Sequence, residues 1–245
     1  MKMSNIKMNR SLPPLPPKIK KYLYKINGIA ISNKKYRWGI NIIEKYIRRY
    51  SFSDNEKYRL GLLYDHLTWN VGELIKNEKR KNNLIDKYLT RAKNIYEEII
   101  KKNSDYFLAL YGIGRVYNFK GNYNKALYYQ IKAYKKMLKL PKNQRGALAI
   151  GVIYQKKGDY KNAEKWYLKE YKECPKNDFG ATLNLFVFYK ERKNYKKALF
   201  YGIKTEKLLE TEFNKKQYKG VNMKNSDFLK FIRKEINNIK LSAKK

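Results

Sequence analysis

The sequence predicts an all-α protein, a solenoid of stacked antiparallel helix pairs with a C-terminal capping helix. A set of residues recurs in the second half of the chain at steps of 37 and then 35 residues, which indicates stacked copies of one two-helix unit. Apolar residues also keep helical three- and four-residue spacing along most of the chain. The recurring residues are Tyr117, Gly121, Tyr123, Ala126 and Ala133, then Tyr154, Gly158, Tyr160, Ala163 and Glu170, then Tyr189, Lys193, Tyr195, Ala198 and Thr205.

The first 17 residues are expected to form a disordered, basic, proline-rich arm. Leu12–Pro17 favours polyproline II and forbids helix. The motif is open to two interpretations, a ligand for SH3 domains or a stiff lead-in to the first helix.

Residues 18–52 are expected to form a degenerate first helix pair, and residues 53–104 a second pair. Ser53 and Asp54 give a good N-cap signal for that second pair. Tyr64 and Ala92 are 28 residues apart, against nine for the same positions in the regular repeats, which implies a 19-residue insertion. The apolar spacing continues through it, so we expect a long first helix to about Lys79 and a partner from about Leu84. Trp69 is either exposed there or packed near Tyr88.

Residues 105–210 are expected to form three regular repeats, and residues 211–245 a loop and the capping helix. The expected helix pairs are 105–120 with 124–139, 144–157 with 161–173, and 178–192 with 196–210. Phe228, Ile232, Ile236 and Ile239 mark the final amphipathic helix. A terminal helix over the last apolar face is what a solenoid needs for solubility.

This pattern resembles the tetratricopeptide repeat, whose first helix carries a small residue one turn before a tyrosine, as Gly114 precedes Tyr117 and Gly151 precedes Tyr154. The last regular repeat departs, because Phe186 precedes Tyr189. Small residues also stand where the second helix would cross the first: Gly39, Ala92, Ala126, Ala163 and Ala198. The resemblance implies a right-handed solenoid and a binding function.

In the family, first helices line a concave groove that binds peptides. Matching positions imply a mixed apolar and basic groove with no acid, suited to a protein or peptide partner with acidic character. The expected groove residues are Tyr111, Arg115, Asn118, Arg145, Leu148, Val152, Gln155, Leu183, Val187 and Lys190.

A second candidate surface is a row of basic residues on the outward face of the second helices. Nine helical steps past each crossing residue lead to the side opposite the buried face. This basic convex ladder comprises Arg48, Lys101, Lys135, Lys172 and Lys207. It is open to two interpretations, a track for RNA or another polyanion, or a solvated lysine face that reflects an AT-rich genome.

The chain has 245 residues, 43% of them hydrophobic, and a formal net charge of +36. The hydrophobic content is sufficient for a folded core, and the charge attracts polyanions such as nucleic acid, anionic lipid or an acidic protein. The single cysteine, Cys174, favours a reducing, cytoplasmic location, with organelle import left open because no acid precedes Glu44. No apolar run approaches the roughly 20 residues of a transmembrane helix.

No motif for catalysis stands out. His66 is the one histidine, no paired Cys and His ligands are present, and no glycine-rich phosphate loop follows a strand. We therefore expect no enzyme activity, no cofactor and no metal. The competing functions are a non-catalytic adaptor that uses the groove, a ribonucleoprotein-associated factor that uses the ladder, and peripheral attachment to anionic membrane.

Overall fold

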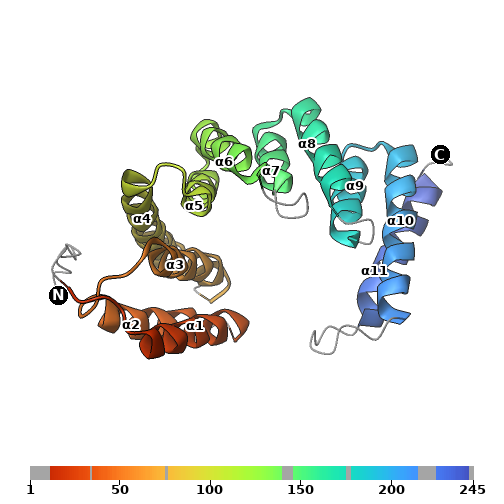
Figure 1. Ribbon diagram of the computed structural model, residues 1–245. Coiled ribbons are helices and arrows are strands. Elements are labelled where there is room, and N and C mark those ends of the chain that lie inside the picture. The colour runs from red at the N-terminus through yellow and green to blue at the C-terminus, as the bar shows by residue number, and fades with distance from the viewer. Residues whose placement is uncertain are drawn as a thin grey trace. The chain divides into compact units, whose positions relative to one another are not determined.

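The computed structural model describes residues 12–33, 35–74, 77–139, 146–174, 178–214 and 225–242 (Figure 1). Over these ranges the chain forms eleven α-helices and no strand. The helices pair in antiparallel fashion along the chain, and the predicted fold class, an α-solenoid of helix pairs with a C-terminal capping helix, is confirmed.

Two compact units divide the chain, Met1–Lys136 and Met137–Lys245, so the three regular repeats predicted over 105–210 are shared between them. Each unit has its own hydrophobic core. The first unit contains α1 (Pro17–Ser32), α2 (Tyr36–Ile47), α3 (Asp54–Leu74), α4 (Glu78–Lys102), α5 (Phe107–Phe119) and α6 (Tyr123–Met137, whose last residue falls in the second unit). The second contains α7 (Ala147–Lys157), α8 (Tyr160–Glu173), α9 (Phe179–Glu191), α10 (Tyr195–Asn214) and α11 (Asn225–Ser242).

A glycine of the first helix allows the two helices of a pair to pack closely. A Cβ atom on Gly61 would come within 2.5 Å of the Tyr96 ring, and one on Gly114 within 2.7 Å of Gln130. Both large residues stand four positions after the crossing alanine of the second helix. Gly114, which the sequence pattern singled out, is therefore required by the size of its partner, and Gly61 has the same role in its own pair.

The last regular pair inverts this arrangement. Phe186 occupies the first-helix position that is Gly61, Gly114 and Gly151 in the three preceding helix pairs, and Gly202 occupies the second-helix position that is Tyr167 in α8. A Cβ atom on Gly202 would lie 3.0 Å from the Phe186 ring. The departure at Phe186 is thus compensated within its own helix pair.

Two other departures from the repeat pattern also have partners. Thr205, at the position of Ala133, has its hydroxyl oxygen 3.0 Å from that of Thr182 and donates to the carbonyl of Tyr201. Glu170, at the same position of α8, accepts a 3.0 Å hydrogen bond from the backbone N–H of Leu148. That bond caps the start of α7, where Gly146 provides no side-chain cap.

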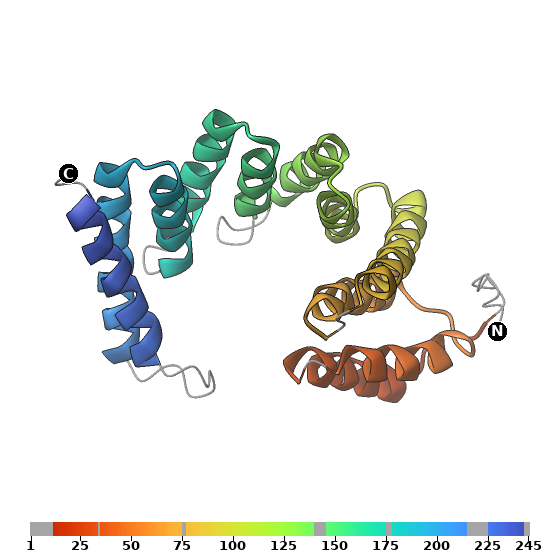
Figure 2. The same cartoon turned by 180° about the vertical axis from the view of Figure 1, so that it is seen from behind.

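The capping helix α11 packs along α10, as Figure 2 shows from behind. Its buried residues Ile232, Ile236 and Ile239 join the core of the second unit, as the apolar spacing predicted. The α10 helix runs to Asn214, so the predicted loop does not begin at residue 211.

The boundary between α3 and α4 also differs from the prediction. Helix α3 ends at Leu74 instead of about Lys79, and α4 begins at Glu78 instead of about Leu84. The side chain of Asn77 accepts from the N–H of Arg80 and caps α4. The insertion therefore lengthens both helices of the pair. The Trp69 side chain lies outside the described part of the structure.

The predicted disordered arm is wrong for its last residues. The carbonyl of Pro13 accepts a 2.9 Å hydrogen bond from the N–H of Ser51, and Leu15 packs against the first core. Pro17 begins α1, a position that suits proline because its missing N–H would lack a helical partner. Residues 1–11 lie outside the described part of the structure.

Candidate functional site

The expected groove residues fall on the first helices of their pairs. Tyr111, Arg115 and Asn118 are on α5 of the first unit, and the others described are on α7 and α9 of the second unit. Arg145 lies outside the described residues. The expected groove residues are thus divided between the two compact units, and each part is described by itself.

Arg115 of α5 pairs with an acid, which corrects the expectation of a groove without one. Its Nε lies 3.1 Å from Oδ2 of Asp65 on α3, and only 2% of Asp65 is exposed. Although the two charges are close, Asp65 Oδ2 has no hydrogen-bond partner among the described residues, so the contact is an ion pair without good hydrogen-bond geometry. Arg115 therefore joins two helix pairs.

Burial dominates the protonation of the groups around this ion pair. It raises the pKa of Asp65, and the Arg115 charge offsets that effect in part. The pKa of His66 is lowered by burial and by the same arginine. Burial also raises the pKa of Tyr58 to about 12. The only histidine of the chain is thus a neutral neighbour of a structural ion pair.

The polar groove residues of the second unit are engaged in the same way. Gln155 donates to Glu191 at 2.7 Å and accepts from the hydroxyl of Tyr167 at 2.5 Å. Lys190 pairs with Glu235 of the capping helix at 2.6 Å. The positive charge of Lys190 is therefore neutralised by an acid of the chain itself, and the Gln155 amide is already hydrogen-bonded.

The apolar groove residues of the second unit remain partly accessible. Leu148 and Val152 of α7 and Leu183 of α9 are half-buried against the core, and Val187 of α9 is 38% exposed. Leu183 and Val187 are one helical turn apart, so they share one face of α9. This face therefore offers apolar contacts to a partner.

Sequence reasoning missed the first-helix residues of the two N-terminal pairs. Tyr24 of α1 and Tyr58 of α3 occupy the position of Tyr111, and all three are half-buried residues of the first unit. The signal was available for Tyr24, which precedes the crossing residue Gly39 by 15 positions as Tyr111 precedes Ala126. It was also available for Tyr58, which precedes Tyr64 by six positions as Tyr111 precedes Tyr117.

All five residues of the basic convex ladder are exposed. Arg48, Lys101 and Lys135 belong to the first unit, and Lys172 and Lys207 to the second. Within the described ranges none of the five has an ion-pair partner. The ladder thus differs from the groove in the pairing of its charges, because most of the groove's charged residues form ion pairs.

Among the described residues, no group of three His, Cys, Asp or Glu side chains is placed to hold a metal ion. Over the same ranges, no helix combines the length and apolar character needed to cross a bilayer.

Comparison with known proteins identifies the fold. No family model matches the chain, and no curated protein matches it. Among solved structures, MamA residues 41–end from Desulfovibrio magneticus RS-1 matches with a TM-score of 0.55 at 15% identity, over 78% of this chain and 95% of that chain. MamA of MSR-1 matches with a TM-score of 0.51 at 17% identity, over 80% and 99%.

A tetratricopeptide repeat-containing protein from Cytophaga hutchinsonii also matches, at 16% identity over 77% of this chain and 80% of that chain, with a TM-score of 0.41. At such identities the likeness extends to the fold alone. The two MamA structures, whose TM-scores exceed 0.5, support a solenoid of helix pairs.

Proposed function

We propose that this chain is a non-catalytic scaffold that binds a segment of a partner protein on the first helices of its second unit. The observation that carries the proposal is the partly accessible apolar face of Leu148, Val152, Leu183 and Val187. Exposed first-helix surfaces of solenoids suit extended or helical segments with apolar anchors.

The proposed partner has acidic character outside its apolar anchors. The chain carries a net charge of +36, so acidic segments are attracted over distances of several ångströms beyond direct contact. Inside the groove Lys190 is already neutralised by Glu235, and the amide of Gln155 does not neutralise the Glu191 carboxylate to which it donates, so acids of the partner are expected at the edges. A cytoplasmic location belongs to the same proposal.

Affinity capture with purified chain as bait tests this function, in lysate of the source organism treated with nuclease. The variant is Val187→Glu, which places a charge on the most exposed of the described groove residues with little effect on folding. Phe200→Glu is the matched control, because Phe200 is 60% exposed on α10, a second helix.

The wild type and Phe200→Glu are expected to retain a nuclease-resistant protein partner that Val187→Glu loses, with equal helical circular dichroism for all three. If every partner stays bound to Val187→Glu, the α7 and α9 face is not the binding surface.

The second candidate function is binding of RNA or a similar polyanion along the basic convex ladder. The observation that favours it is that all five ladder residues are exposed and lack ion-pair partners among the described residues. Exposed, unpaired lysine and arginine side chains can neutralise the phosphates of a nucleic acid and release the counterions bound to it.

A further inference from the structure

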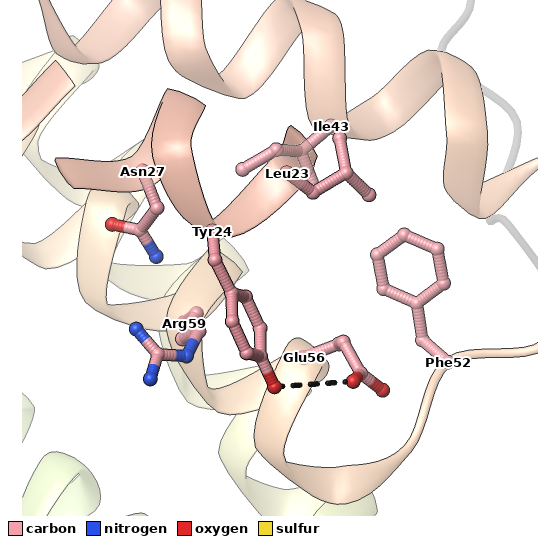
Figure 3. Close-up of a pocket in the computed structure, with 7 residues that line it drawn as sticks. All are labelled: Leu23, Tyr24, Asn27, Ile43, Phe52, Glu56 and Arg59. Atoms are coloured by element: carbon pink, nitrogen blue, oxygen red, sulfur yellow. Dashed lines mark hydrogen bonds between the residues drawn. The ribbon is translucent and has the colours of Figure 1, made fainter. Parts of the chain in front are cut away.

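A small cavity in the first unit lies between α1, α2 and α3 (Figure 3). Its volume is about 10 Å³, which is room for one water molecule. The lining residues are Leu23, Tyr24, Asn27, Ile43, Phe52, Glu56 and Arg59. This cavity is therefore closed to a peptide, a nucleotide or a lipid, and the surface of the second unit offers more to a partner.

The outward face of α10 combines two exposed apolar side chains with two exposed lysines. Phe200 is 60% exposed and Ile203 is 48% exposed. Lys196 and Lys207 flank them, each four residues away, so all four residues share one face of the helix. Neither lysine has an ion-pair partner among the described residues. A partner that buries Phe200 and Ile203 gains hydrophobic stabilisation.

The outward face of α8 continues this surface. Lys165, the half-buried Leu168 and Lys172 stand at the repeat positions of Phe200, Ile203 and Lys207. Helices α8 and α10 lie side by side, with the rings of Tyr171 and Tyr201 5.6 Å apart. We call the combined surface the basic apolar face, and it comprises Lys165, Leu168, Lys172, Lys196, Phe200, Ile203 and Lys207.

The acids on the flanks of α8 and α10 are paired with other cations. Glu164 of α8 pairs with Lys197 at 2.7 Å. Glu206 of α10 pairs with Arg233 of α11 at 2.7 Å, and Glu210 pairs with the same arginine. These acids therefore leave the lysines of the basic apolar face with their positive charge.

We propose that the basic apolar face binds the surface of a membrane that contains anionic phospholipids. The lysines contact the headgroups, and Phe200 and Ile203 enter the boundary between headgroups and acyl chains. The charge of the face is complementary to such a surface, whereas a second copy of this chain would bring lysines against lysines. Ile203 also favours lipid over nucleic acid, because a branched aliphatic side chain cannot stack on a base.

This membrane contact goes beyond the proposed function, and it involves none of the groove residues of α7 and α9. The two can therefore fail separately. Phe200→Glu, the control for the groove, is expected to keep the groove partner and to lose binding to anionic vesicles, because it places a negative charge against the headgroups.

Sedimentation with sucrose-loaded vesicles tests the proposal, with the full chain at about 0.15 M salt. One set of vesicles contains about 30% phosphatidylserine in phosphatidylcholine, and the other contains phosphatidylcholine alone. The wild type is expected to sediment with the first set and not with the second. No sedimentation with the anionic vesicles, or equal sedimentation with both sets, overturns the proposal.

The double variant Phe200→Ser, Ile203→Ser removes the apolar side chains and leaves the charge unchanged. The matched control is Phe231→Ser, Leu241→Ser, because these residues of α11 are 52% and 65% exposed in the same unit. Binding to anionic vesicles is expected to weaken about tenfold or more in the first variant and to stay unchanged in the control, with equal helical circular dichroism for all chains.

Two results of this comparison contradict the proposal. Unchanged binding of Phe200→Ser, Ile203→Ser would mean that the vesicles adsorb the chain through its net charge alone. Equal weakening in the control would mean that exposed apolar side chains act without regard to their place on the chain.

The lysines of the face are tested with Lys196→Gln, Lys207→Gln. The control is Lys234→Gln, Lys240→Gln, which changes two exposed lysines of α11 and alters the net charge equally. Binding to anionic vesicles should weaken about tenfold or more in the first variant and less than about twofold in the control. Equal weakening would show that the position of the lysines does not matter, and the proposal would fail.

Single-stranded RNA is the alternative ligand for the same lysines. In fluorescence anisotropy, Phe200→Ser, Ile203→Ser is expected to bind RNA as the wild type does, because it keeps every lysine. If this variant loses as much affinity for RNA as for anionic vesicles, the apolar pair does not select lipid, and the proposal is wrong.

Discussion

The Nε atom of Arg115 lies 3.1 Å from Oδ2 of Asp65, a carboxylate that is almost fully buried and belongs to the preceding helix pair. Arg115→Gln would leave that carboxylate without its compensating charge. We expect a loss of roughly 3–5 kcal/mol of unfolding free energy at neutral pH, measured by urea denaturation.

The pH dependence of that loss tests its cause. Burial raises the pKa of Asp65 in the folded chain, and removal of Arg115 raises it further. The folded variant then binds a proton more readily than the unfolded chain does, so its stability rises as the pH falls. The difference in unfolding free energy between the wild type and Arg115→Gln should therefore shrink as the pH falls from 8 to 5. A difference that stays constant with pH would exclude Asp65 as its origin.

The inverted pair Phe186 and Gly202 predicts strong coupling between two substitutions. Phe186→Gly opens a cavity and should cost about 3–5 kcal/mol, and Gly202→Tyr overfills the same space and should cost about 1–3 kcal/mol. The double variant restores the arrangement of Gly151 with Tyr167. Chemical denaturation should show that it loses at least about 1 kcal/mol less than the sum of the single losses. Additive losses would argue against direct packing of the two positions.

Glu170 is expected to stabilise the start of α7 through its bond to the N–H of Leu148. Glu170→Ala should cost about 0.5–2 kcal/mol, as for other helix caps, whereas Glu170→Gln keeps an acceptor oxygen and should cost less. Thermal melting of the two variants checks that Glu170→Ala loses more stability than Glu170→Gln does. Equal losses would attribute the effect to charge instead of to the hydrogen bond.

Binding of nucleic acid by the basic convex ladder is tested by fluorescence anisotropy with single-stranded RNA at several salt concentrations. Affinity should fall steeply as salt rises, and Lys135, Lys172 and Lys207 changed together to Glu should abolish binding. The control changes Lys25, Lys79 and Lys87 to Glu, because these exposed lysines lie outside the ladder and the charge difference is the same. Equal effects of both triple variants would mean that RNA binding depends on the net charge of the chain and not on the position of the ladder residues.

The sequence was sufficient to predict the positions of the helix pairs, because a small residue marks the place where the two helices of a pair cross. The spacing of Tyr117 to Ala126 and of Tyr154 to Ala163 predicted where α5 to α8 would lie. The α3–α4 boundary was missed because apolar spacing continues past Leu74, and the cap at Asn77 is a weak signal without its structural context.

The candidate groove was predicted less well, because charge pairs depend on residues far apart in the chain. Arg115 and Lys190 were predicted to be groove residues, but their partners Asp65 and Glu235 lie 50 and 45 positions away.

The exchange of bulk between Phe186 and Gly202 also bears on how this chain can be re-engineered. Repeats of a solenoid are often treated as interchangeable cassettes for shuffling or consensus averaging. Consensus averaging treats positions 186 and 202 independently, and it would put glycine at position 186 and a large side chain at position 202. A chimaera with its breakpoint between α9 and α10 would take the two positions from different repeats, so their contact would contain either two large side chains or two glycines. Recombination at the ends of whole helix pairs keeps the two together.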